Sequence, residues 1–150
     1  MTELEKNIQI VKDMHAAFTK RDLPAVLGFL SDDIDWQSPV SRTISKEITW
    51  SKPRRGRKEV EAFFKDLFGA IKPDRLDLLT FTAQDDRVIV EGTSYGSVIS
   101  TGCSYHNDWV MLFTLREGKV IKFRQYYDSA DVAAAFHAKG EECVATPKAA

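Results

Sequence analysis

The feature that most constrains this chain is an alternation of apolar and polar residues that begins near Pro73 and continues to Tyr127. A period of two residues places successive side chains on opposite faces of a β-strand. Turn-forming residues divide the segment into strands expected at about 75–83, 87–99, 104–115 and 119–127. Because the connections between these strands are short, the segment predicts a curved antiparallel sheet.

The residues before this sheet follow a helical pattern. Thr2 and Glu5 have the spacing of a capping box, and apolar residues then recur at helical intervals as far as Phe18. Asp22 is expected to cap a second, shorter helix that ends at Leu30. A third helix is expected after residue 56, because five apolar residues there share one face: Val60, Phe63, Phe64, Leu67 and Phe68.

Two further segments complete the expected architecture. A short strand over residues 34–38 is followed by a loop of 17 residues, 40–56, and loops of this length are uncommon and often functional. After the sheet, a short helix at 129–138 precedes a polar, alanine-rich end. The pattern predicts one α+β domain over residues 1–138, with three N-terminal helices around the sheet, and a flexible tail over 139–150.

The last hairpin has two possible registers. A two-residue loop at Glu117 and Gly118 alone places Lys122 and Arg124 on the same face as Trp109, which is unfavourable. We therefore expect a three-residue loop that ends with Gly118 in a left-handed bulge. This register groups the following residues on the inner face: Asn107, Trp109, Met111, Phe113, Ile121, Phe123, Gln125 and Tyr127.

Composition excludes several classes of partner. The 21 basic and 22 acidic residues leave a net charge of −1, which gives no general attraction for nucleic acid or an anionic membrane. The N-terminus is charged where a signal peptide is apolar, and no apolar segment is long enough to span a membrane, so we expect a cytoplasmic protein. In a reducing compartment, Cys103 and Cys143 are expected to be free thiols.

Three local segments give the chain a family resemblance. They are RDLPAVLGFLSDDIDWQSP, GRKEVEAFF and WVMLFTLREGKVIKFRQYYDSADVAAAF. In these segments, and more loosely over residues 4–138, the chain resembles the SnoaL-like, ketosteroid isomerase-related proteins of the nuclear transport factor 2-like superfamily. The resemblance implies a cone-shaped fold with a pocket for a small molecule, and a fold alone does not define a reaction.

The catalytic groups known in related enzymes are absent from the matching positions. Steroid isomerases of this superfamily use a carboxylate base, a tyrosine and a protonated aspartic acid, and these positions resemble Ser38, Met14 and Met111. The Asp–Arg–Asp group of limonene epoxide hydrolases resembles Ser94, Gly92 and Gln125, and SnoaL-type cyclases also use an acid near Gln125. We therefore expect neither steroid isomerase nor epoxide hydrolase chemistry of the known kinds.

The expected inner face combines aromatic and uncharged polar side chains, which is the usual composition of a small-molecule site. The polar members need hydrogen-bonding partners that a ligand or water can supply. The candidate ligand-binding residues are Met14, Phe18, Trp36, Ser38, Phe64, Ser94, Asn107, Trp109, Met111, Gln125 and Tyr127. Plain core packing is the alternative interpretation for each aromatic residue.

The available proton carriers are few. His15 lies beside the apolar stripe of the first helix, and Asp35 and Tyr127 lie on strands. Asp128 precedes the last helix and is first interpreted as its N-cap. The three histidines at 15, 106 and 137 have no metal-ligand spacing, so neither a metal nor another cofactor is expected.

A basic segment, KPRRGRK at residues 52–58, has two interpretations. It is either a solvated loop or a binding site for an anionic group of the substrate next to a helix N-terminus.

Two functions fit these observations. The first is a cofactor-independent cyclase, isomerase or hydrolase that acts on a hydrophobic, oxygenated compound. The second is a non-catalytic module that binds a small ligand. We also expect a homodimer formed through the convex face of the sheet, where Val110, Leu112 and Tyr126 point outward.

Overall fold

The computed structural model describes residues 1–43, 45–139 and 142–143. Three helices precede most of the sheet: α1 (Glu3–Thr19), α2 (Leu23–Gly28) and α3 (Arg57–Ala70). The expected capping box is present, because the Thr2 side chain accepts a hydrogen bond from the Glu5 N–H and the Glu5 carboxylate accepts one from the Thr2 N–H. Asp22 caps α2 as expected, although this helix ends at Gly28.

The main sheet has six strands in the order β2-β1-β6-β5-β4-β3. Their bounds are β1 (Leu30–Gln37), β2 (Arg54–Arg55), β3 (Ile71–Gln84), β4 (Arg87–Val98), β5 (Ser104–Arg116) and β6 (Lys119–Tyr127). The last four strands pair antiparallel in chain order, as the alternation predicts. The sheet as a whole is mixed, because β1 returns from α2 to pair parallel with β6.

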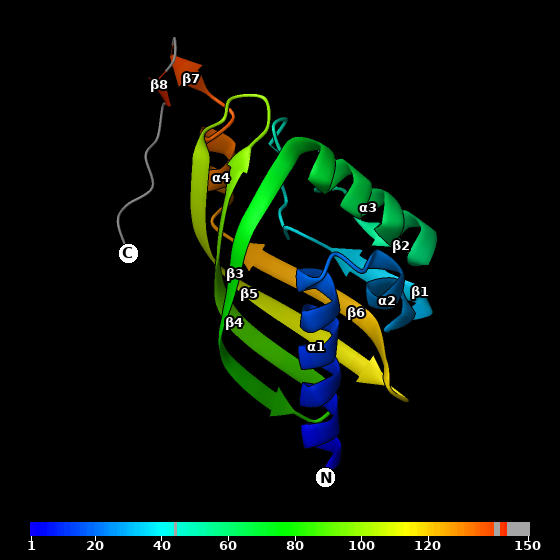
Figure 1. The fold of residues 1–150 in the computed structure, drawn as a ribbon. Coiled ribbons are helices and arrows are strands. Elements are labelled where there is room, and N and C mark those ends of the chain that lie inside the picture. Colours follow the sequence, from blue (N-terminus) through cyan, green and yellow to red (C-terminus); the bar gives the residue numbers. More distant parts are fainter. Residues whose placement is uncertain (44, 140–141, 144–150) are drawn as a thin grey trace.

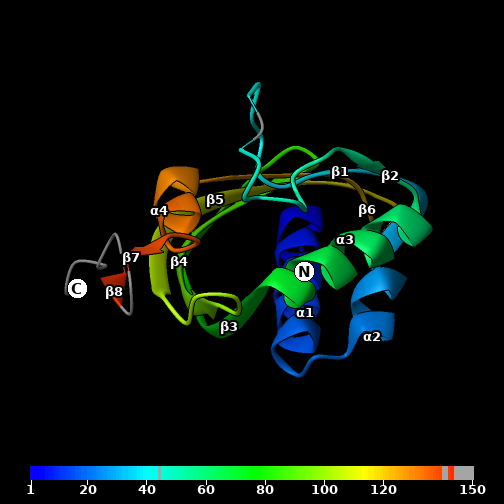
Figure 2. The same ribbon diagram turned by 90° about the horizontal axis from the view of Figure 1, so that it is seen from above.

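The helices and the sheet enclose the core. The sheet curves strongly, and α1, α2 and α3 lie on its concave side, whereas α4 (Ser129–Ala134) lies near one end (Figures 1 and 2). The α3 residues Val60, Phe63 and Phe64 are buried, as their spacing predicts. The expected α+β fold, with helices wrapped around a curved sheet, is confirmed.

The β5–β6 hairpin reaches the expected inner face by a different route. Arg116 pairs with Lys119, and both intervening residues, Glu117 and Gly118, have positive φ, so the loop has two residues and not three. The register then shifts at Ile121, which has no partner across the ladder, and this β-bulge restores the alternation. Trp109, Met111 and Phe113 consequently pair with Tyr127, Gln125 and Phe123.

The bulge also changes one expected core position. Val120 is fully buried, whereas Ile121, which was expected on the inner face, is only half-buried. The compensating bulge was expected inside the turn, whereas it lies at Ile121, the third residue of β6.

The expectation of two free thiols is wrong. Cys103 and Cys143 form a disulfide across a sequence separation of 40 residues. A short hairpin of β7 (Ala138–Lys139) and β8 (Glu142–Cys143) brings the second cysteine back to the loop before β5. The other residues of the expected tail, 140–141 and 144–150, lie outside the described residues.

Within the described part of the chain, no helix has the length and apolarity needed to cross a membrane.

We propose that two copies pair through the outer face of β5 and β6. Tyr126 is 50% exposed there and Leu112 is half-buried, so an apolar patch faces solvent in the single chain. Sedimentation at micromolar concentration is expected to give the mass of two chains for the wild type and of one chain for Leu112→Glu. The control Ala62→Glu adds the same charge on the exposed side of α3 and should remain dimeric. A wild-type mass of one chain would contradict the pairing.

Candidate functional site

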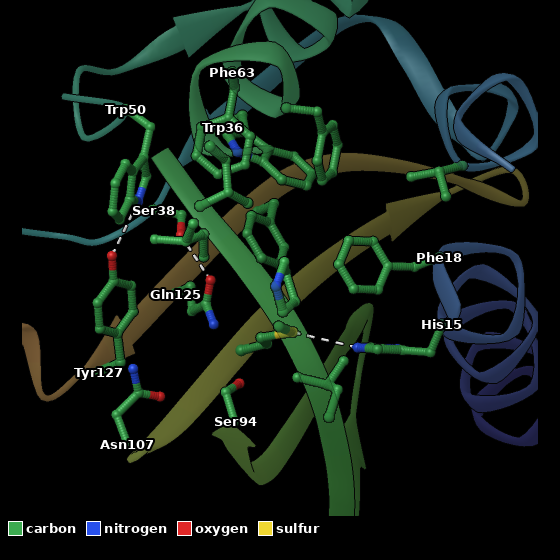
Figure 3. A pocket seen from close by; sticks show the side chains of 18 of the residues that line it. His15, Phe18, Trp36, Ser38, Trp50, Phe63, Ser94, Asn107, Gln125 and Tyr127 are labelled. Carbon is green, nitrogen blue, oxygen red and sulfur yellow. Dashed lines mark hydrogen bonds between the residues drawn. The ribbon is translucent and has the colours of Figure 1, made fainter. Parts of the chain in front are cut away.

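A cavity of about 130 Å³ lies between the concave face of the sheet and helices α1 and α3 (Figure 3). Ten of the eleven predicted ligand-binding residues line it: Met14, Phe18, Trp36, Ser38, Phe64, Ser94, Asn107, Met111, Gln125 and Tyr127. Sequence reasoning missed other lining residues, among them Trp50, which comes from the long loop, and Tyr105, which alternates with Asn107 on the same face of β5. The alternation of side chains along β5 could have predicted Tyr105, because it lies two residues before Asn107.

The apolar wall is a cluster of aromatic rings. Trp36 on β1 stacks on Phe123 of β6 with 4.0 Å between ring centroids, and it meets Phe63 and Phe64 of α3 edge-on at 5.4 and 5.6 Å. Stacked and edge-on contacts are the preferred geometries of aromatic pairs, so these rings form a closely packed part of the wall. It presents carbon to any molecule inside.

The polar groups come from β4, β5 and β6 and from Ser38, which follows β1 (Figure 3). Ser38 donates a hydrogen bond of 2.6 Å to the side-chain oxygen of Gln125, which leaves the Gln125 amide N–H groups without a partner among the described residues. Ser94 and Asn107 make no side-chain hydrogen bond to another described residue. These groups can donate to oxygen atoms of a bound molecule.

The long loop supplies part of the wall. Ile48, Trp50 and Ser51 are each at most 3% exposed, so this described part of the loop is packed against the domain. The Trp50 indole N–H donates to the Tyr127 hydroxyl oxygen at 3.1 Å. That oxygen is therefore already an acceptor, and its own O–H proton has no acceptor among the described residues. Burial raises the pKa of Tyr127 above its usual range, so the hydroxyl stays protonated and acts as a donor.

His15 projects from α1 into the cavity (Figure 3) and is 6% exposed. Its Nδ1 lies 2.9 Å from the Val11 carbonyl oxygen, and because a carbonyl only accepts, Nδ1 carries the proton. Burial lowers the pKa of His15 below the 6.5 of a free histidine, so the ring is neutral at pH 7. Nε2 then holds a lone pair. Its neighbour at 3.3 Å is the Met111 thioether, which has no hydrogen to donate.

Trp109, the remaining predicted ligand-binding residue, is buried behind His15 and does not line the cavity. Its indole stacks on the imidazole with 6.4 Å between centroids and 8° between planes. It lies over Gly92, where an added Cβ would overlap the indole ring. That Cβ would also overlap the Asp77 carbonyl oxygen, so no side chain fits at the position that resembles the arginine of epoxide hydrolases.

The two remaining acidic candidates do not line the cavity. Asp35 pairs with Arg124 at 2.9 Å, and this hydrogen bond is the main reason that the pKa of Asp35 lies below its usual range. Asp128 caps α4 by accepting from the Asp131 N–H at 3.3 Å, as expected. No Asp or Glu of residues 1–43, 45–139 and 142–143 lines the cavity.

The basic segment at residues 52–58 is largely structural. Arg54 is 3% exposed and pairs with Asp66 at 2.9 Å. Arg57 donates to the Leu30 carbonyl and pairs with Asp32, and Arg55 lies 3.8 Å from Asp35. Three of its five cationic side chains are thus paired with acidic residues of the domain. The described residues also contain no group of three metal-ligating side chains.

The structure places the chain among the NTF2-like proteins. The solved NTF2-like protein of Burkholderia xenovorans LB400 superposes with a TM-score of 0.77 at 29% identity, over 91% of this chain and 100% of that one. TerC, crystallised with polyporic acid, has a TM-score of 0.77 at 23% identity, over 87% of this chain and 97% of that one. This similarity concerns the fold alone.

Sequence comparison gives the family. The pattern of the SnoaL-like domain matches residues 11–123, and the chain belongs to this family. The uncharacterised protein YesE of Bacillus subtilis strain 168 is 23% identical over an alignment of 145 positions. The alignment covers 91% of this chain and 90% of YesE.

The lowered pKa of His15 predicts a pH-dependent stability. Below about pH 6.5 the unfolded chain binds a proton at this residue more readily than the folded chain, so stability falls as the pH falls. His15→Gln should remove this component. Urea unfolding at pH 7 and pH 5 should show a larger loss for the wild type than for the variant, and equal losses would contradict a buried neutral imidazole.

Trp109 is expected to be a structural support of the site. Trp109→Ala should lower the free energy of unfolding by roughly 3–5 kcal/mol, because it leaves a large cavity behind His15. Chemical denaturation measures this change. Leu79→Ala removes an apolar side chain of β3 that is 63% exposed and serves as the control, with a much smaller effect on the free energy of unfolding.

Proposed function

We propose that this chain is a cofactor-independent proton-transfer enzyme, an isomerase or cyclase, for a small and mainly apolar molecule that carries carbonyl or hydroxyl oxygens. The observation that carries the proposal is the lone pair on His15 Nε2, held in a cavity that also contains hydrogen-bond donors. The crystallisation of the structural neighbour TerC with polyporic acid supports a small organic ligand in this fold.

The proposed chemistry begins with enolisation. His15 Nε2 takes a proton from a carbon next to the carbonyl group, and the electron pair of that C–H bond moves towards the carbonyl oxygen. Tyr127 donates its O–H to the developing oxyanion, with the Gln125 amide as a second donor. Return of the proton to another carbon completes an isomerisation. Alternatively, the enolate carbon attacks a second carbonyl group of the same molecule, and the protonated His15 then returns its proton to the resulting alkoxide, which completes a cyclisation.

The environment favours each of these roles. Burial keeps His15 neutral at pH 7, which is the form that accepts a proton, and it keeps Tyr127 protonated, which is the form that donates. The aromatic wall surrounds the site with apolar groups, and a hydrogen bond to an oxyanion is stronger in such a low-dielectric environment.

Exchange of carbon-bound protons tests the proposal without knowledge of the natural substrate. The probe is 2-tetralone, an apolar ketone with acidic C–H bonds, followed by NMR in D2O. The wild type should accelerate deuterium uptake, and His15→Gln should lower this acceleration by about 10²–10⁴-fold. His106→Gln, a change of the same kind at a residue that stacks on Tyr95 outside the cavity, should have no effect. The wild-type rate should persist below pH 6.5, because the pKa of His15 is lowered.

One observation favours the non-catalytic alternative, namely that no described carboxylate lines the cavity. Quenching of tryptophan fluorescence by 2-tetralone separates the two functions. Binding without exchange above the buffer rate would support a ligand-binding module. Failure of this probe and of related cyclic ketones to bind would contradict both functions.

A further inference from the structure

A second hollow, of about 440 Å³, adjoins the cavity on the side of the α1–α2 turn. The two share the side chains of Phe18, Val26, Ile71 and Pro73 as lining. Sites for small molecules usually have volumes of roughly 300–1,000 Å³, and the inner cavity of about 130 Å³ is below this range. A ligand that extends from the cavity into the hollow would have the usual amount of space.

An arginine at an unusual backbone position forms one side of this hollow. Arg21 has a φ of 60° and occupies the left-handed position at the end of α1. The Asp22 N–H bonds to the Ala17 carbonyl and the Arg21 N–H to the Phe18 carbonyl, which together form the motif that glycine usually completes. An arginine is disfavoured at this position by about 1 kcal/mol. The backbone conformation by itself therefore gives no reason for an arginine at this position.

The guanidinium of Arg21 is held in place from two sides. It lies over the rings of Phe18 and Phe68, at 5.7 and 4.9 Å from their centroids. One terminal nitrogen donates to the Pro73 carbonyl oxygen at 3.1 Å. Its other N–H groups have no acceptor among the described residues, and it has no described acidic partner.

The surroundings of Arg21 favour an anion with an apolar body. Lys72 also lines the hollow, and it has no ion pair among the described residues. The acid in the lining, Asp22, already accepts a hydrogen bond from the Ala25 N–H as the cap of α2. Ile99 lies in the same hollow with 58% of its surface exposed, which leaves an apolar contact for a ligand to cover.

We infer that this hollow binds the carboxylate end of an amphiphilic ligand whose ring system occupies the inner cavity, with Arg21 and Lys72 as the anion-binding residues. The inference rests on the proposed function for the position of the ring system, and it adds the substrate class, a cyclic carboxylic acid. Arg21 sets the specificity for the acid over its neutral analogue.

The experiment compares two probes of the same shape and different charge, 1-naphthylacetate and 1-naphthylacetamide, by tryptophan fluorescence at low ionic strength. The wild type should bind the acid more tightly than the amide. Arg21→Asn, which keeps a residue that tolerates the left-handed backbone, should weaken acid binding by about three- to five-fold and leave amide binding unchanged, as expected for a solvent-exposed pair. Arg21→Lys should restore part of the preference.

Lys20→Gln is the matched control, because it removes a neighbouring exposed charge that does not line the hollow. It should leave the preference for the acid unchanged, and Arg21→Asn with Lys72→Gln should abolish that preference. Equal wild-type affinities for the two probes, or an acid preference that survives the double change, would overturn the anion site and leave the proposed inner cavity intact. If neither probe bound, this inference would fail, and the exchange experiment with 2-tetralone would still decide the proposed function.

Discussion

The pairing of β5 with β6 is the constraint on which the rest of the site depends. Because a strand alternates its side chains, a slip of one residue would carry Gln125 and Tyr127 to the outer face and bring Arg124 into the cavity. The bulge at Ile121 prevents this exchange. It lets a tight two-residue turn at Glu117 and Gly118 coexist with an inner face that is apolar and uncharged in β6.

The same alternation keeps most charged side chains out of the cavity and places uncharged polar side chains in it. Arg124 pairs with Asp35 on the other side of the sheet from the cavity, and Arg54 pairs with Asp66 under the long loop. Within the cavity the polar groups are amides, hydroxyls, one imidazole and the guanidinium of Arg75, which has an acidic partner on its own strand. An unpaired charge in such a site would be costly, whereas neutral groups with spare hydrogen-bonding capacity remain available to a ligand.

Burial shifts the pKa values of His15 and Tyr127 in opposite directions, and both side chains are neutral as a result. It disfavours the charged form of each group, which lowers the pKa of the imidazole and raises that of the phenol. Both side chains are consequently neutral near pH 7, one as an acceptor and the other as a donor. Their partners fix these roles, since Nδ1 of His15 is bound to Val11 and the oxygen of Tyr127 accepts from Trp50.

The sequence by itself determined the order of the elements, the four antiparallel strands and part of the cavity lining, because hydrophobic period and capping are local properties. It determined neither the position of the bulge nor the parallel return of β1 to β6, which depend on pairing between distant segments. The burial of Trp50, the displacement of Trp109 behind His15 and the Cys103–Cys143 disulfide were decided only by the tertiary structure. Each of these contacts joins residues far apart in the chain. The spacing of residues along the sequence predicts local structure, and it does not predict which distant segments meet.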